Sequence, residues 1–462
     1  MRARILALAD DRWASAFVAL LAGALAAGLA LVAPKYALAS VALAVALVGL
    51  AVALRRLEIG VIGLVLAASL DVTGRIASVG GANITLYQVG AFAVAIIAVW
   101  GIARERSPLP ETPMDVPVAA FLLLSAASIA PAPAVNTALV AFVSLASSAL
   151  LLYLVVLAAR TPDAAERIIW ATLGAAAVLG LMALLERKHI FSVQPPLNIW
   201  GYGIRSRVTF KDPNIFGAFL ATALCLATPL WIRLKGVGRK TIAGAAMAAA
   251  LLGLGLTFSR GALVAFLLGM LVVLVFARVP FSWKVAALLA GLIGMFVVGV
   301  KLVDPALIQS KIINITTNHS AVQRIYLARS SWEMSRDHPM GVGIGNYAQV
   351  SPLYRQAEVN LKLVESHTAY LTVLAEVGIL GLIAFAWLIV RFLGPVFAAV
   401  RRAPDDVHTI ALAALAAGVG LLAQALTYSL EASKFLWLTF GLGMAAVTMY
   451  RANSKGSDDG AV

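Results

Sequence analysis

The chain has 462 residues, of which 61% are hydrophobic and only 13% are charged. Soluble domains average about 45–50% apolar and about 25% charged residues, so this composition excludes an ordinary water-soluble fold. Lys and Arg (36) outnumber Asp and Glu (22), and the net charge of +14 favours anionic partners, namely membrane lipids and phosphate groups.

The basic residues 1–12 precede an apolar stretch at 13–33. Secretory signal peptides share this order, but this stretch is longer than a signal core and no small-residue cleavage site follows it. We therefore expect residues 13–33 to remain as the first membrane helix. The single cysteine, Cys225, lies in an apolar run and cannot form an intrachain disulfide.

Apolar runs of membrane-spanning length recur along the chain. A helix needs about 20 apolar residues to cross about 30 Å of hydrocarbon. Fourteen runs reach or approach that length: 13–33, 36–54, 58–70, 86–103, 116–131, 138–158, 168–185, 214–232, 242–256, 262–277, 285–303, 368–390, 407–428 and 435–450. Three of them (58–70, 242–256 and 262–277) are short, and a broken or re-entrant helix is the alternative there. The sequence predicts an all-α integral membrane protein with 12–14 transmembrane helices.

The distribution of Lys and Arg predicts the orientation, because short cytoplasmic loops retain these residues. With the N-terminus in the cytoplasm, the inner segments hold 20 of the 36 Lys and Arg residues. Twelve of the other 16 lie in two long outer loops, 186–213 and 301–366. Long loops translocate regardless of charge, so their basic residues do not contradict this orientation. We expect both termini, including the tail 451–462, in the cytoplasm.

The first outer loop, 186–213, carries Arg205, Arg207 and Lys211 just before a predicted helix. The run Asp212-Pro213-Asn214 can cap that helix and form its first turn. Because a helix start attracts anions, this pattern predicts an anion clamp. The alternative is a basic patch next to a helix cap, without a ligand.

A short polar turn, Leu256-Thr257-Phe258-Ser259-Arg260-Gly261-Ala262, separates two apolar runs. An arginine at membrane depth costs roughly 3 kcal/mol or more and usually faces a cavity or a partner. Irregular backbone at that depth is not exposed to lipid. We therefore expect Arg260 to line a water-filled site. The alternative is a side chain that extends to the membrane interface.

The large outer loop, 304–366, carries Arg324 in a predicted helix at 321–337. The run Pro339-Met340-Gly341-Val342-Gly343-Ile344-Gly345 follows that helix. Its glycine spacing is not GxGxxG and no strand precedes it, so we expect a tight turn instead of a nucleotide-binding loop.

His367 stands at the outer mouth of a predicted membrane helix, and Tyr370 follows one helical turn later. A helix start disfavours the protonated imidazolium, so His367 is expected to be neutral and able to accept a proton. A lone histidine at this position is also compatible with a packing or interfacial role.

Together these segments resemble the O-antigen ligase and O-antigen polymerase family of bacterial inner-membrane glycosyltransferases. The resemblance covers roughly residues 200–385. Its pieces, in order, are Arg205…Thr209-Phe210-Lys211-Asp212-Pro213-Asn214, Ser259-Arg260-Gly261, Arg324…Trp332…Pro339-Met340-Gly341-Val342-Gly343 and His367…Gly378-Ile379-Leu380-Gly381. Ligases of the family have Asn, Ser or Gln after the histidine, whereas this chain has Thr368.

The resemblance implies a GT-C-like, metal-independent, inverting enzyme without a cofactor, with its active site on the periplasmic face of the inner membrane. The implied donor is a glycan on undecaprenyl diphosphate, and the implied acceptor is a sugar hydroxyl. His367 would be the general base and Tyr370 would shape the acceptor site. The diphosphate would be bound by Arg205, Arg207, Lys211, Arg260 and Arg324.

Three interpretations of the function stay open. A polymerase extends another lipid-linked glycan, and a ligase transfers the glycan to lipid A–core; Thr368 slightly favours the polymerase. A flippase for lipid-linked oligosaccharides would also be polytopic with a cationic cavity. A transporter should carry pseudo-symmetric halves with sites at the midplane, whereas the polar motifs here gather on one side. Membrane lipids and a chain-length regulator are further expected partners; nucleic acid is not.

Reporter fusions test the orientation. Reporters fused after Arg56, Arg106, Arg167, Lys240 and Arg402 should be cytoplasmic, because these residues lie in short basic loops. Reporters within 190–210 and 310–360 should be periplasmic. The measurement is alkaline phosphatase activity against fluorescent protein emission for each fusion. Phosphatase activity at the Lys240 fusion would contradict the topology.

Overall fold

The computed structural model describes residues 56–71, 75–79, 82–105, 110–194, 197–199, 203–278, 319–354 and 366–458. The expected helices at 13–33, 36–54 and 285–303 lie outside the described residues. The expected total of 12–14 spans therefore stays a prediction.

Each of the eleven other apolar runs forms a helix, so an all-α membrane protein is confirmed. The helices are α3 (Leu57–Ser69), α4 (Leu86–Glu105), α5 (Asp115–Ala127), α6 (Val135–Ala158), α7 (Pro162–Arg187), α8 (Pro213–Arg233), α9 (Val237–Leu256), α10 (Arg260–Phe276), α15 (Ala369–Arg402), α16 (Asp405–Gln424) and α17 (Lys434–Asp458). Within the described residues, seven helices (α4, α6, α7, α8, α9, α15 and α16) are long and apolar enough to span a membrane, and α3, α5 and α10 are shorter apolar helices. Helix α9 is longer than its apolar run, because polar residues 237–241 form its first turn.

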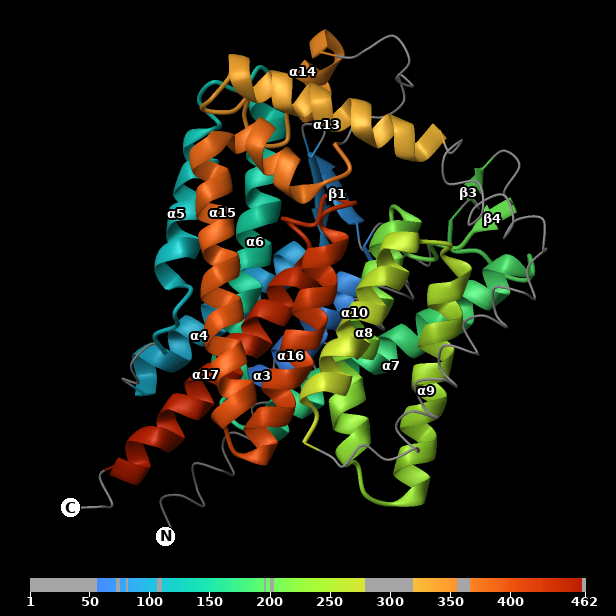
Figure 1. Cartoon of the computed structure of the whole chain (residues 1–462), viewed down its shortest axis with the longest axis vertical. Helices are drawn as coiled ribbons and strands as arrows, with labels where there is room; N and C mark the ends of the chain where they lie inside the picture. Colours follow the sequence, from blue (N-terminus) through green and yellow to red (C-terminus); the bar gives the residue numbers. More distant parts are fainter. Residues whose placement is uncertain are drawn as a thin grey trace, which may run out of the picture.

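Two short antiparallel hairpins interrupt the helices, which the sequence did not predict. Strand β1 (Arg75–Val79) pairs with β2 (Ala82–Thr85) between α3 and α4, and β3 (Leu197–Ile199) pairs with β4 (Gly203–Arg205) before α8. Both hairpins lie toward the upper end of the bundle in Figure 1.

Helices α8 and α16 form the centre of the bundle. In each, 83% of the most apolar 18-residue stretch is buried within the protein, against 22% in α4. Helix α16 packs against α8, α10, α15 and α17, while α7 packs against α9. The α7–α9 crossing is very close: a Cβ added to Gly253 would lie 2.6 Å from the Gly180 Cα. Small residues at such crossings are typical of helix packing in lipid.

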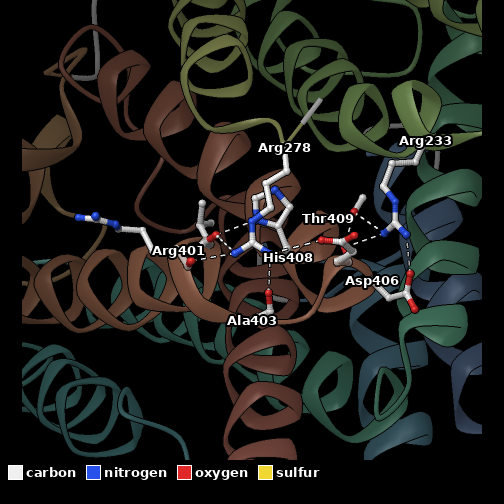
Figure 2. Close-up of polar contacts among 9 residues, drawn as sticks. Arg233, Arg278, Arg401, Ala403, Asp406, His408 and Thr409 are labelled. Atoms are coloured by element: carbon white, nitrogen blue, oxygen red, sulfur yellow. Dashed lines mark hydrogen bonds and ion pairs between the residues drawn. The ribbon is translucent and has the colours of Figure 1, made fainter. Parts of the chain in front are cut away.

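Two arginines join the lower ends of four helices (Figure 2). Arg278, after α10, donates to the Val400, Arg401 and Ala403 carbonyls at the end of α15 over 3.2, 2.8 and 2.7 Å. Those carbonyls would otherwise lack a helical partner. Arg233, at the end of α8, contacts Asp406 Oδ1 at 2.7 Å.

Further contacts of basic residues involve the first turns of α16 and α3. Arg233 also donates to Thr409 Oγ1 over 2.7 Å, within the first turns of α16. Arg167 in α7 pairs with Glu58 in α3 at 2.7 Å. Acidic residues in the first turns of α3 and α16 are favourable for the helix dipole, and they give these arginines partners.

Helix α15 is broken at Gly378, which has φ 86° and ψ −176°. In an unbroken helix the Ile379 N–H would donate to the Ala375 carbonyl. Here Ile379 donates to the Pro339 carbonyl over 3.1 Å, and Ala375 accepts from the Val342 N–H over 2.9 Å. The Pro339–Gly345 loop is therefore inserted into the hydrogen-bond ladder of the helix.

The glycines of this loop confirm the expected turn and show what it contacts. Gly341, Gly343 and Gly345 have φ of 84°, 98° and 75°, a region that glycine adopts without strain. The Glu376 carboxylate accepts from the Gly345 N–H at 2.7 Å and from the Tyr347 N–H at 3.0 Å. One carboxylate thus fixes the end of the loop to α15.

The large loop forms a short cap over this junction. Helix α13 (His319–Asp337), near the expected 321–337, lies across the upper end of the bundle (Figure 1). Helix α14 (Tyr347–Val350) and the 3₁₀ helix η3 (Ser351–Tyr354) follow. A small core that includes Met334, Val342 and Tyr347 joins α13 to Ala375 of α15.

Alanine substitutions test the inserted loop. A Cβ at Gly341 would lie 2.3 Å from the Glu376 carbonyl oxygen, and a left-handed backbone costs an L-residue roughly 1–2 kcal/mol. Gly341→Ala and Gly378→Ala should therefore lower the thermal unfolding midpoint of the purified protein. Gly394→Ala in α15 is the matched control, because a Cβ added there would meet no atom within 4 Å and alanine favours helix. Equal midpoints for the three variants would show that the loop does not hold the helix.

Candidate active site

Asn214 joins the first outer loop to the polar turn. Asp212 caps α8 as expected, accepting from the Asn214 N–H at 2.6 Å. The Asn214 side-chain oxygen accepts from Arg205 Nη2 at 3.2 Å and from Ser259 Oγ at 2.9 Å. Arg205 Nε also donates to the Thr257 carbonyl over 2.9 Å. Two motifs about fifty residues apart are therefore held by one amide.

Arg260 is the exposed first residue of α10. Ser259 caps this helix by accepting from the Ala262 N–H. The next residue, Gly261, packs on α16, since a Cβ there would lie 2.7 Å from Thr427 Oγ1. The end of α16 also reaches the first loop: Gln424 Nε2 donates to the Asn214 carbonyl over 3.0 Å.

The backbone N–H groups of the other two basic residues of the loop donate to acidic side chains that are distant in the sequence. The Arg207 N–H donates to Glu186 Oε2 at the end of α7 over 3.1 Å. Arg207 Nη1 donates to the Lys211 carbonyl over 3.1 Å, and the Lys211 N–H donates to Asp71 Oδ2 over 2.9 Å. We call Arg205, Arg207 and Arg260, which lie in the loop and the turn that Asn214 joins, the arginine cluster.

His367 lies directly before α15, whose N-cap is Thr368. This placement agrees with the helix mouth expected from the sequence. Its φ is 57°, in a region where His, Asn and Asp are enriched among non-glycine residues. Its ring lies 5.9 Å from the Tyr428 ring, centroid to centroid. Strained backbone of this kind gathers at functional sites.

Two neighbouring cavities open beside these residues. The first has a volume of about 460 Å³, and its polar lining includes Ser366, Thr372, Glu376, Tyr428 and Glu431. The second has about 440 Å³, and its polar lining includes Asp71, Tyr87, Gln88, Ser147 and Lys434. Residues lining both are Ser144, Lys211, Ile215, Ser429, Glu431 and Ala432.

The structure brings some of the predicted site residues together but not all of them. Arg205 and the Ser259-Arg260-Gly261 turn are brought together, and the end of α16 joins them to His367. The Tyr370 hydroxyl donates to the Leu422 carbonyl over 3.0 Å, so this side chain packs on α16; its role at the acceptor site stays a prediction. Arg324 lies in α13, and its side chain is outside the described residues.

The segment 424–434, which contains Tyr428, Glu431 and Lys434, was not predicted to be part of the site. The signal was present: a polar run, Thr427-Tyr428-Ser429-Leu430-Glu431-Ala432-Ser433-Lys434, separates two apolar runs. Asp71 was also missed, because nothing local links it to residues 140 positions away. Within the described residues, no group of three or more His, Cys, Asp or Glu side chains could hold a metal ion.

The fold and the site define a polytopic membrane protein whose polar groups meet at one end of the bundle. Residues 245–386 match the family described as O-antigen ligase. This match to part of the chain supports the resemblance to the O-antigen ligase and polymerase family that the sequence motifs indicated. The matched region contains Arg260 and His367, whereas Arg205 precedes it and joins it through Asn214. No curated protein matches the chain at a significant level.

Proposed function

We propose that this protein transfers a glycan from an undecaprenyl-diphosphate donor to a sugar hydroxyl at the periplasmic face of the inner membrane. The observation that carries the proposal is the course of residues 424–428. Gln424 and Thr427 contact the elements that bear the arginine cluster, and Tyr428 contacts His367. This segment therefore connects the elements of the arginine cluster, which would bind the anion, to His367, which would accept the proton.

The arginine cluster would hold the donor diphosphate. Charge builds up on the leaving diphosphate as the glycosidic bond breaks, and preorganised cations stabilise that charge. Arginine suits this role because its planar fork can make two parallel hydrogen bonds to one phosphate. The contacts of Arg205 with Thr257 and Asn214 orient its guanidinium before substrate arrives.

His367 would act as the general base. A sugar hydroxyl is a weak nucleophile, and a positioned histidine that takes its proton contributes typically 10²–10⁴-fold. Ser366, beside His367, and Tyr428, which contacts its ring, line the first cavity. Direct attack of the activated hydroxyl on the anomeric carbon would invert its configuration. No step in this scheme calls for a metal ion.

The orientation proposed from the sequence suits this reaction. Arg167, Arg233 and Arg278 lie at the other end of the bundle from the site, as short cytoplasmic loops require,. The acceptor is a second lipid-linked glycan or lipid A–core. Thr368, found where ligases of the family have Asn, Ser or Gln, favours the polymerase reaction slightly.

Charge-conserving substitutions test the cluster. Arg260→Lys should lower kcat/KM for transfer by about tenfold or more, because an ammonium cannot reproduce the arginine fork. The thermal midpoint should not change, since the Arg260 side chain is exposed at a helix start. Arg329→Lys is the control: Arg329 is exposed and pairs with Glu333 within α13. Full activity of Arg260→Lys would remove the basis for diphosphate binding there.

Substitution of His367 tests the base. His367→Asn is the sharper variant, because asparagine tolerates the left-handed backbone whereas alanine is strained there. His367→Asn and His367→Ala should both reduce transfer by about 10²-fold or more while donor binding persists. Wild-type activity should fall as pH is lowered, because protonated imidazole cannot accept a proton.

His338 is the control histidine, exposed at the end of α13 and 6.5 Å from the Tyr354 ring. His338→Ala should retain most of the activity. An inactive His338→Ala together with an active His367→Asn would show that His367 is the wrong histidine for the base.

A further inference from the structure

The two cavities beside His367 are neighbouring chambers, since six residues line both. They lie between α6, the start of α8 and the segment 424–434. We call them the first chamber (about 460 Å³) and the second chamber (about 440 Å³). Of the five residues predicted to bind the diphosphate, only Lys211 is among the described residues that line them. The chambers therefore differ chemically from the arginine cluster.

The charges of the second chamber balance one another. Lys434 Nζ lies 3.6 Å from Asp71 Oδ1 and 4.8 Å from the centroid of the Tyr87 ring. Lys211 and Glu431 supply one further charge of each sign. Two acids and two bases leave no excess positive charge to attract a phosphate. In the first chamber, the two negative charges of Glu376 and Glu431 exceed the single positive charge of Lys211.

The remaining polar lining suits a ligand rich in hydroxyl groups. The second chamber presents the Ser144, Ser147, Ser433 and Gln88 side chains and the Tyr87 ring. Hydroxyl and amide side chains donate and accept hydrogen bonds, and carboxylates accept strong ones from hydroxyls. Each chamber has the volume of a small-ligand pocket, about 300–1,000 Å³. An uncharged sugar meets these conditions.

The segment 424–434 places the chambers relative to the reaction. Gln424 and Thr427 lie against the elements of the arginine cluster, Tyr428 touches His367, and residues 429–434 line the chambers. A nucleophile that inverts a centre must approach from the side opposite the leaving group. With the diphosphate at the arginines, the chambers lie on the nucleophile's side.

We propose that the paired chambers bind uncharged sugar residues of the acceptor, with Glu431 accepting hydrogen bonds from their hydroxyls. This assignment rests on the proposed transfer reaction. Glu431 lines both chambers, so its carboxylate would contact the sugar next to His367 and the sugar beyond it. Ser144 lines both from the opposite helix, α6.

The test uses the full-length protein in lipid nanodiscs. A deletion strain of the source bacterium supplies the probes: its unused polyprenyl-diphosphate glycan as donor and its unextended glycolipid as acceptor. Glu431→Gln should raise the acceptor KM by about tenfold, the effect of one lost charged hydrogen bond, and leave the donor KM unchanged. Ser144→Leu, which narrows both chambers without changing a charge, should do the same. Glu333→Gln, on the exposed face of α13, should match the wild type.

The outcomes separate the two proposals. A raised donor KM, a lower kcat alone or unchanged kinetics in both variants would overturn the chamber assignment. Binding of the labelled acceptor glycolipid without donor gives an independent readout, and Glu431→Gln and Ser144→Leu should weaken it. A wild-type protein that binds the glycolipid but transfers glycan neither to it nor to a second lipid-linked glycan would overturn the proposed reaction. Binding that both variants leave intact would overturn the assignment of the chambers to the acceptor, but not the proposed reaction.

Discussion

The exchange of backbone hydrogen bonds at Gly378 is the contact on which the architecture of the site depends. A broken helix exposes polar backbone groups, which cannot remain without partners in contact with lipid. The Pro339–Gly345 loop supplies those partners: Val342 and Gly343 donate to the Ala375 and Glu376 carbonyls, and Pro339 accepts from Ile379. The large outer loop is thereby fixed to the helix that follows His367.

This junction also shapes the first chamber. The Glu376 carboxylate accepts from Gly345 and Tyr347, and all three residues line that chamber. The break thus converts one face of a membrane helix into a polar wall.

The segment 424–434 contacts the three parts of the candidate site one after another along the chain. Its first residues lie against the elements of the arginine cluster, Tyr428 lies against His367, and Glu431 and Lys434 lie in the chambers. A connection this short leaves little freedom between the three parts. The groups proposed for anion binding, proton transfer and sugar recognition therefore follow one another in order along this segment.

The sequence predicted features whose causes are local. Apolar runs predicted the helices, Asp212 and Pro213 predicted the start of α8, and the spacing of three glycines predicted a turn. Asp71 and Glu431 were missed because their partners are set by packing between helices far apart in the chain. Tyr370 was predicted from helical spacing alone, and spacing does not say which face of α15 meets α16.

The Pro339–Gly345 turn shows which features can be predicted from neighbouring residues and which cannot. The positive φ of Gly341 is readable from the sequence, whereas its contact with Glu376 is not. The two residues are 35 positions apart, and the contact requires the break at Gly378. The loop glycines and Gly378-Ile379-Leu380-Gly381 are separate motifs in the sequence, yet they form one structural unit.

The length of α15 bears on the depth of the proposed site in the membrane. Its 34 residues include 25 from the break to Arg402, which rise about 37 Å at 1.5 Å per residue. That part alone covers the roughly 30 Å of hydrocarbon, even when tilted by about 20°. In the proposed orientation, His367 would stand near the level of the outer lipid headgroups. A polyprenyl-diphosphate donor would present its phosphates at this same level, so it could arrive by lateral diffusion with its tail still in the bilayer.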